Sequence, residues 1–293
     1  MIRDSFYQYL QSEKRFSVHT VAAYKSDLSQ FGDYLTATYG ISADAEITYS
    51  MVRSWLASLI DEGLTSRSVN RKLSTLKAYF RYLMKEGLIS FNPVSKAISL
   101  SIPSRLPAFA SVSEMETILQ LPSGDDEFGL RRDLLVIEIL YSTGIRLSEL
   151  IGLKLNDLDR GALTIKVTGK RNKQRIIPVT KQLTRLIDEY LKLREAVVIQ
   201  GVQEIIVTDQ GKKAYPVFIY RLVKHYLTLA GVKGVKSPHL LRHTFATHML
   251  NEGADLNAIK EILGHASLAA TQVYTHNSIE KLKSIYKLAH PRA

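Results

Sequence analysis

Cysteine is absent from the 293 residues of the chain. This absence excludes disulfides, thiolate metal sites and thiol nucleophiles, and it is typical of proteins in a reducing cytosol. Long hydrophobic runs are also missing, since the most apolar stretch, residues 134–141, is short and is interrupted by Glu138. The polar, mixed-charge residues 1–14 do not resemble a secretion signal. We therefore expect a soluble, cytoplasmic protein with no membrane association.

Acidic residues are few relative to basic ones. The chain has 39 Lys and Arg against 28 Asp and Glu, which gives a formal net charge of +11. Such an excess attracts polyanions, but an incidental basic surface produces the same total. The length predicts about two domains, and a hydrophobic content of 45% with only 8 prolines is typical of a folded protein.

The first third of the chain is predicted to be helical. From Val21 to Leu35 apolar residues recur at steps of three and four, which is the spacing of one buried helix face. Thr48 is expected to cap a second helix that Gly63 ends, and Ser66 is expected to cap a third that runs to Gly87.

This third helix has two different faces. Its apolar side consists of Val69, Leu73, Leu76, Phe80 and Leu83. Its cationic side consists of Arg67, Arg71, Lys77, Arg81 and Lys85. A helix kept soluble by its charges normally mixes in acids, yet Glu86 at its end is the only one. The pattern favours a helix that packs on its own domain and lies along nucleic-acid phosphates.

A proline-rich stretch predicts two domains, with residues 1–95 as a helical domain, 96–107 as a linker and 108–293 as a second domain. Ser113 and Glu116 are predicted to form a capping box at the start of the second domain. Helices are expected up to Tyr141 and over 147–150, followed by a β-hairpin with strands near 163–167 and 174–179. The remaining expected helices cover 181–198, 216–230, 238–251, 257–263 and 278–288.

Between Arg160 and Arg185 every charged residue is basic. The set is Arg160, Lys166, Lys170, Arg171, Lys173, Arg175, Lys181 and Arg185. The predicted hairpin turn lies within this run and carries Lys170, either into a DNA groove or against a phosphate. A solvated hairpin tip is the alternative.

The segment 237–248 is rich in polar chemistry. Pro238 suits a first helical position, which places His239, Arg242 and His243 on one face near a helix N-terminus that favours anions. A zinc pair of His239 and His243 is the less favoured alternative, because Arg242 would repel a dication. We expect His243 and His248 to be structural.

Two further clusters complete the set, Thr143-Gly-Ile-Arg146-Leu-Ser-Glu149-Leu and Leu263-Gly-His265-Ala-Ser followed by Tyr274. Together with Gly169-Lys170, Asn172-Lys173-Gln-Arg175 and His239-Leu-Leu-Arg242, they resemble the active-site set of the tyrosine site-specific recombinases. The resemblance extends over the whole chain, and its compact length resembles the Xer-type members.

This resemblance implies that Arg146, Lys170, His239, Arg242 and His265 surround a DNA phosphate and that Tyr274 is the nucleophile. It further implies that Lys170 is the acid for the leaving 5′-oxygen, that His239 is the base toward the phenol, and that Glu149 orients the arginines. The candidate DNA-binding residues are Arg67, Arg71, Lys77, Arg81, Lys85, Arg171, Lys173 and Arg175. No metal or other cofactor is implied, because a phosphotyrosine intermediate conserves the bond energy.

The expected fold is mainly α, a two-domain DNA clamp with a helical core-binding domain and a helical catalytic domain that carries a small β-hairpin. The resemblance also implies a homo- or hetero-tetramer on double-stranded DNA with a specific recombination site. Leu282, Ile285, Tyr286 and Leu288 would form the apolar face of a C-terminal helix that docks on the next subunit, and an intramolecular helix is the alternative. Xer-like chromosome dimer resolution is the expected role. The alternatives are an integrase or invertase of a mobile element, a type IB topoisomerase, a non-catalytic DNA-binding protein and a zinc hydrolase.

Overall fold

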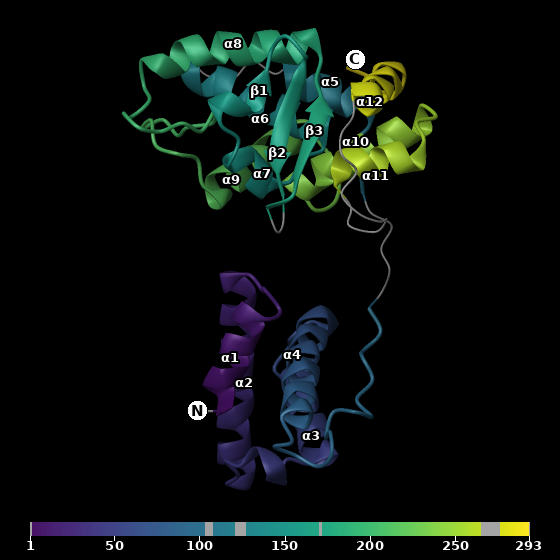
Figure 1. The fold of residues 1–293 in the computed structure, drawn as a ribbon. Coiled ribbons are helices and arrows are strands. Elements are labelled where there is room, and N and C mark those ends of the chain that lie inside the picture. The colour runs from purple at the N-terminus through teal and green to yellow at the C-terminus, as the bar shows by residue number, and fades with distance from the viewer. Residues whose placement is uncertain (1, 103–107, 121–126, 170–171, 265–275, 293) are drawn as a thin grey trace. The chain divides into compact units, whose positions relative to one another are not determined.

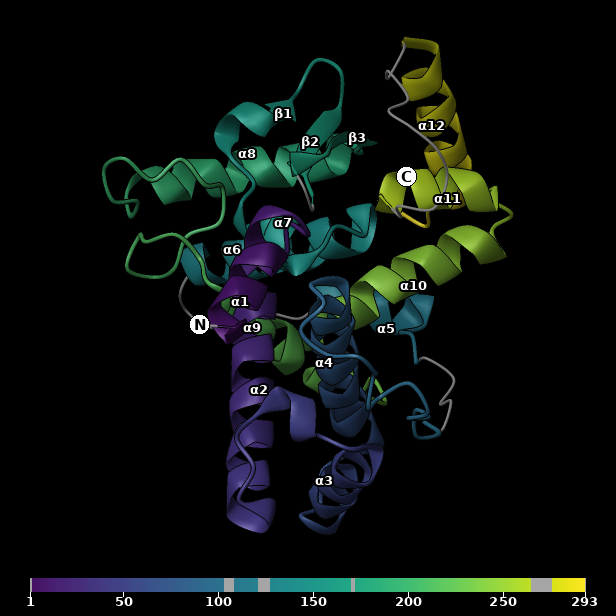
Figure 2. The ribbon, with the colours of Figure 1, turned by 60° about the horizontal axis from the view of Figure 1, so that its bottom comes forward.

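The computed structural model describes residues 2–102, 108–120, 127–169, 172–264 and 276–292, with backbone alone for 276–282. The chain divides into two compact units, Met1–Arg105 and Leu106–Ala293 (Figures 1 and 2). The division falls inside the segment 96–107 that the sequence analysis predicts as a linker. Each unit has its own hydrophobic core.

The N-terminal unit is a bundle of α-helices. They are α1 (Ile2–Ser12), α2 (Val18–Tyr39), α3 (Tyr49–Asp61) and α4 (Ser66–Lys85), with a short 3₁₀ turn η1 (Asp44–Glu46). Helix α2 contacts α1, α3 and α4, and the apolar stripes of the helices meet in a core that includes Phe6, Trp55 and Phe80.

Helix α4 confirms the predicted amphipathic pattern. All five residues of its apolar side are at most 2% exposed. The cap differs from the prediction by one residue, because the Thr65 hydroxyl, rather than that of Ser66, accepts the Ser68 amide at 3.3 Å. Burial of the apolar stripe against α2 and α3 holds the helix in place and turns its basic side outward.

The first residues of the predicted linker pack on the N-terminal unit. The Asn70 side chain donates to the Leu100 carbonyl at 2.9 Å and accepts the Leu100 amide at 2.8 Å. Val94 and Ala97 are buried in the same core as α4. The amide side chain thus pairs with the backbone as a neighbouring strand would, and residues 94–100 belong structurally to the first unit.

The C-terminal unit combines α-helices with a small sheet. The helices are α5 (Val112–Gln120), α6 (Glu127–Thr143), α7 (Leu147–Ile151), α8 (Lys181–Glu195), α9 (Pro216–Leu229), α10 (Pro238–Asn251), α11 (Leu256–Leu263) and α12 (His276–Ala289), with a 3₁₀ turn η2 (Leu155–Asp157). The strands are β1 (Leu158–Asp159), β2 (Thr164–Thr168) and β3 (Gln174–Pro178). This architecture confirms the mainly α fold.

The predicted capping box of α5 is wrong by two residues. The Glu114 amide donates to the Ser111 hydroxyl at 3.2 Å, and the Ser111 amide donates to the Glu114 carboxylate at 2.7 Å. Both pairs have the same spacing, so the pattern alone does not separate them. With Ser111 as the cap, Met115 and Ile118 are buried in the core.

Helix α6 is the centre of the C-terminal unit. Residues 135–143 are buried on every side of the helix, and α6 contacts α5, α7, α8, α9 and α10 (Figure 1). A helix that is apolar all round belongs in the middle of a core. Because α6 ends at Thr143, the segment that follows it starts deep inside the unit.

The sheet confirms the predicted hairpin and adds a short strand to it. The order is β1-β2-β3, all antiparallel, with Ile165 opposite Ile177 and Val167 opposite Arg175. The Gly169 amide donates to the Lys173 carbonyl at 2.8 Å and closes the turn. Helices α11 and α12 both contact β3 (Figure 2). Helix α10 contacts α11 and α12.

Within the described ranges, no helix is long and apolar enough to cross a membrane.

Candidate active site

Glu149 is the centre of a buried ionic cluster. It lies in the first turn of α7, and its side chain is 1% exposed. Arg146 precedes the helix, and its amide donates to Oε2 at 2.8 Å while its Nη1 donates to Oε1 at 3.0 Å. From β3, Arg175 donates through Nη1 to Oε1 and through Nη2 to Oε2, both at 2.9 Å. Burial raises the pKa of Glu149, but the hydrogen bonds from Arg175 and Arg146 outweigh it and hold the pKa below its usual value.

A glycine turn brings a third arginine to the cluster. Gly144 has a φ of +59°, and a Cβ there would lie 2.6 Å from the Phe245 ring and 2.7 Å from Leu263. The close approach allows the Gly144 carbonyl to accept a hydrogen bond from Arg242 Nη1 at 2.6 Å. Arg242 lies in α10, is 9% exposed, and its pKa is lowered to about 10 by burial and then by Arg146 and Arg175. It stays charged at neutral pH.

The three guanidinium groups converge on the C-terminus of α11. The last carbonyls of a helix lack intrahelical partners and carry the negative end of its dipole, so cations are favoured there. Three consecutive carbonyls, the last two of α11 and that of its C-cap Gly264, each accept from a different arginine. The pairs are Arg175 Nε to Ile262 O at 2.6 Å, Arg242 Nη2 to Leu263 O at 2.7 Å and Arg146 Nη2 to Gly264 O at 3.3 Å.

The cluster has the electrostatics of an anion site. Three arginines and one carboxylate, Glu149, make up the cluster, so cations outnumber acids in it. Arg146 is the most exposed of the three arginines, with 35% of its side chain accessible. A planar guanidinium binds an anionic phosphate by paired hydrogen bonds, so a phosphate fits this site.

The structure brings together Arg146, Arg242 and Glu149, as the sequence analysis expects. His239 lies in the first turn of α10, exposed and one turn before Arg242. The predicted residues Lys170, Arg171, His265 and Tyr274 lie outside the described residues.

Arg175 corrects a prediction, because it is not a surface cation. It is 5% exposed, and Nε, Nη1 and Nη2 all donate to groups of the same unit. A signal was present in the sequence: side chains alternate along a strand, so Arg175 shares a face with Ile177, which is fully buried. The cluster also uses the Gly144 and Leu263 carbonyls, whose part in holding Arg242 the sequence motifs do not show.

The cations of α4 differ in their surroundings. Arg67 and Arg81 are exposed and Lys77 is half-buried. Arg71 forms an ion pair with the buried Asp27 while 48% of its side chain stays exposed. Lys85, also exposed, lies 3.7 Å from the carboxylates of both Glu13 and Glu86. Outside α4, Lys173 of the hairpin turn is exposed as well.

Two histidines of α10 have structural surroundings. His248 is 4% exposed, and its Nδ1 lies 2.9 Å from the Tyr141 hydroxyl. His243 is half-buried, with its ring near that of Phe109. Among the described residues no group of three metal-ligating side chains is found.

The described part of the C-terminal helix packs on its own unit. Helix α12 contacts α10, α11 and β3, and Tyr286 is 3% exposed, whereas Leu288 is 85% exposed. After the helix, Arg292 reaches the buried Glu138 of α6 at 3.4 Å, and the His290 ring stacks on Tyr286. Burial lowers the pKa of His290 to about 4. The side chain of Leu282 lies outside the described residues.

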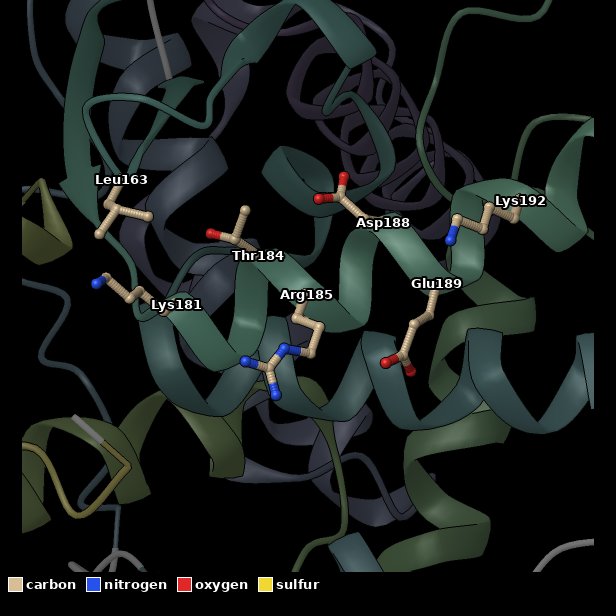
Figure 3. A pocket seen from close by; sticks show the side chains of 7 residues that line it. All are labelled: Leu163, Lys181, Thr184, Arg185, Asp188, Glu189 and Lys192. Carbon is tan, nitrogen blue, oxygen red and sulfur yellow. The ribbon is translucent and has the colours of Figure 1, made fainter.

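A cavity of about 410 Å³ lies along α8 (Figure 3), and a smaller one of about 100 Å³ is lined in part by Glu149. Lys181 and Arg185 line the larger cavity together with Asp188 and Glu189. The two acids pair with Arg160 at 2.8 Å and with Arg131 at 3.1 Å. Lys192 also lines this cavity, so its described lining carries three cations and two acids.

The chain matches two family models. Residues 110–281 match the phage integrase family, and residues 4–87 match the phage integrase N-terminal SAM-like domain. It is similar to tyrosine recombinase XerC of Pelobacter propionicus, with 38% identity over 99% of this chain and 95% of the relative. It is also similar to tyrosine recombinase XerD of Proteus mirabilis, with 35% identity over 100% of this chain and 93% of the relative.

Among solved structures, the chain resembles the XerH site-specific recombinase bound to a palindromic difH substrate in a post-cleavage complex. The TM-score is 0.73 and the identity is 23%, and the match covers 99% of this chain and 82% of that one. At this identity the likeness shows the fold.

Proposed function

The chain belongs to the phage integrase family and is a Xer-type tyrosine recombinase, and on that premise we propose that its arginine cluster binds the scissile phosphate of a duplex DNA recombination site. The observation that carries the proposal is the convergence of three guanidinium groups on the carbonyls at the end of α11, with two of them, Arg146 and Arg175, also held by the buried Glu149. The positive charge that remains after Glu149 is neutralised matches the negative charge that a phosphate develops during transfer.

Arg146 and Arg242 bind the nonbridging oxygens as planar forks. Such donors are worth most in a partly buried site, where they are already oriented before the charge develops. Glu149 acts on the reaction through Arg146, whose amide and guanidinium it holds.

Tyr274 supplies the nucleophile. Its phenol oxygen forms a bond to phosphorus, the bond from phosphorus to the 5′-oxygen breaks, and the 5′-oxygen leaves with a proton. Lys170 donates that proton and His239 accepts the phenol proton, while His265 donates a hydrogen bond to the phosphate. Attack of a 5′-hydroxyl from another strand on the phosphotyrosine then rejoins the DNA, through a Holliday junction.

The partner is double-stranded DNA, which the exposed cations of α4 and of the hairpin turn contact through phosphates. Strand exchange between two duplexes requires four protomers, so we propose a homo- or hetero-tetramer linked by the C-terminal helix. Leu288, exposed in the single chain, would contact the neighbour, and Tyr286 would have to leave its own core to join it.

The proposed role is chromosome dimer resolution in the cytoplasm, linked to chromosome partition at cell division, and integration or inversion of a mobile element is the alternative. Mapping where the protein binds its own genome separates them, since dimer resolution predicts one chromosomal site.

Covalent trapping tests the chemistry. A duplex nicked near the crossover loses a short fragment after cleavage, so the wild-type protein is expected to accumulate a covalent DNA adduct on a denaturing gel. Tyr274→Phe should abolish the adduct and leave DNA affinity unchanged, because only the nucleophilic oxygen is lost. An adduct of undiminished yield in the variant would place the nucleophile elsewhere.

A supercoiled plasmid without any recombination site separates the recombinase from a topoisomerase. Relaxation of that plasmid at the rate seen on a plasmid with the site would favour the topoisomerase.

A further inference from the structure

Arg175 contacts the same groups that hold Arg146. Each oxygen of Glu149 is shared, since Oε1 accepts from the Nη1 atoms of Arg146 and Arg175, and Oε2 accepts from the Arg146 amide and from Arg175 Nη2. The bidentate contact fixes the plane of the carboxylate. The direction in which Glu149 presents its oxygens to Arg146 therefore depends on Arg175.

Arg175 also binds the carbonyl that directly precedes those of the other two arginines. Its Nε donates to Ile262 O at 2.6 Å, and the next two carbonyls, of Leu263 and Gly264, accept from Arg242 and Arg146. Gly264 has a φ of +66°, and a Cβ at this position would lie 3.1 Å from Arg175 Nη1. The arginine side chain is thus packed directly against the turn that ends α11.

The hairpin turn meets the same cluster. A Cβ at Gly169 would lie 3.1 Å from Glu149 Oε1 and 3.7 Å from Arg175 Nη1. Gly169 immediately precedes Lys170, the proposed general acid. Arg175 consequently lies where three parts of the site join: the α7 N-terminus, the end of α11 and the start of the hairpin turn.

We propose that Arg175 is a positioning residue of the recombination reaction, which sets the phosphate-binding arginines through Glu149 and the C-terminal carbonyls of α11. It does so from a buried position, without contact to DNA. This inference rests on the proposed function, because it concerns the same phosphate site.

The test compares Arg175→Met and Arg175→Lys with the wild type on the nicked substrate, at saturating DNA and in a single turnover. Displacement of the arginines by about 1 Å is expected to slow cleavage by about 100-fold in Arg175→Met, with a smaller loss in Arg175→Lys, which keeps the charge but not the fork. DNA affinity, measured by fluorescence anisotropy, should stay within about twofold of the wild type, since Arg175 does not touch the duplex.

Arg194→Met is the matched control. Arg194 is also a buried arginine of the second unit, 4% exposed, and donates to the carbonyls of Val202, Glu204 and Ile205. Its loss should lower the melting temperature, yet the cleavage rate of the folded protein should remain that of the wild type. All variants are assayed below their melting temperatures, which circular dichroism defines.

A scissile methylphosphonate separates positioning from a merely structural role. It replaces one charged nonbridging oxygen by a methyl group, so the arginines have less negative charge to stabilise during the reaction. The penalty of Arg175→Met should therefore shrink on this substrate by about tenfold or more. An equal penalty on both substrates, or an Arg175→Met variant that cleaves the ordinary phosphate at the wild-type rate, would overturn the positioning role. Absence of any adduct with the wild-type protein would instead overturn the proposed function.

Discussion

Each unit of the molecule contains a buried carboxylate that holds two cations, Asp27 in the first and Glu149 in the second, and these two carboxylates are used differently. Asp27 in the first unit accepts hydrogen bonds from Arg71, from Lys72 at 3.1 Å and from the Thr75 hydroxyl at 2.8 Å. These contacts join α2 to α4. About half of the Arg71 side chain is exposed to solvent, but its guanidinium is paired with Asp27. Its positive charge at the surface is therefore partly offset.

Glu149 in the second unit also binds two cations, but it is part of a larger set. Arg242 joins the cluster through the carbonyls of Gly144 and Leu263, which carry partial rather than full charges. These main-chain dipoles help to hold the guanidinium in place. The Asp27 cluster joins two helices of the first unit, whereas the Glu149 cluster holds arginines that the proposed phosphate site uses.

Removal of the carboxylate charge from Asp27 or from Glu149 is expected to produce the largest difference in cleavage rate between the two units. Loss of one partner from a buried ion pair costs about 3–5 kcal/mol of folding free energy, so Asp27→Asn and Glu149→Gln should both lower the melting temperature. At a temperature where both variants are folded, Glu149→Gln should slow adduct formation by about 100-fold, because Arg146 loses the carboxylate that positions its guanidinium. Asp27→Asn should cleave at the wild-type rate once bound to DNA.

Glu149→Asp provides a milder variant that keeps the charge, and it should fall between Glu149→Gln and the wild type. Equal losses of cleavage in Asp27→Asn and Glu149→Gln would contradict the distinction between the two clusters.

Acid should affect the two units to different degrees. Residues 1–105 contain one histidine, the exposed His19. In the second unit burial lowers the pKa of His290 to about 4, with Tyr141 raising it and His248 and Arg292 lowering it further. The pKa of His290 in the folded protein thus lies below the unfolded value of about 6.5. The neutral ring therefore contributes its full share of folding free energy above about pH 6.5, and this contribution is lost as the pH falls toward 4.

The loss from His290 should be on the order of 2 kcal/mol at pH 5 relative to neutral pH. Thermal unfolding of the wild type and of His290→Phe between pH 8 and pH 5 measures it, since the variant keeps a ring for Tyr286 and removes the titration. A decline of equal size in the variant would mean that another group is responsible.

The salt dependence of DNA binding should show the smallest effect of these changes. We expect part of this dependence to come from the cations of the first unit. Replacement of Arg67, Lys77 and Arg81 by alanine is expected to reduce the slope of log Kd against log salt by about 0.9 for each phosphate that the variant no longer neutralises. Arg71→Ala is a poor choice for this test because it also removes one of the two cations that pair with the buried Asp27. An unchanged slope in the triple variant would place the basic side of α4 away from DNA.

Much of the fold could be predicted from the sequence because its signals are local. The two faces of α4, the hairpin around Gly169 and the helix over 238–251 follow from the spacing of side chains, and the structure confirms them. The errors at the helix starts also have a local origin. At α4 and α5 several hydroxyl residues stand close together, and each satisfies the capping pattern.

The site was only partly predictable. Arg146, Glu149 and Arg242 have recognisable neighbours in the sequence, whereas Arg175 resembled the exposed cations around it. Its burial depends on the strand alternation that places it beside Ile177. Gly144 and Leu263 lie within two of the motifs that the sequence offers, but every residue type has a carbonyl, so these motifs do not show that the two carbonyls, 119 positions apart, hold the same arginine.

The use of main-chain oxygens at the end of α11 has a consequence for how this enzyme tolerates mutation. No substitution deletes a carbonyl, so Ile262 and Leu263 can be exchanged for other apolar residues of similar volume while the arginines keep their acceptors. Gly264 is the weak point, because a side chain there must adopt a φ of +66° and press on Arg175. Libraries of variants can therefore randomise the exposed residues of α11 broadly, provided that Gly264 is kept.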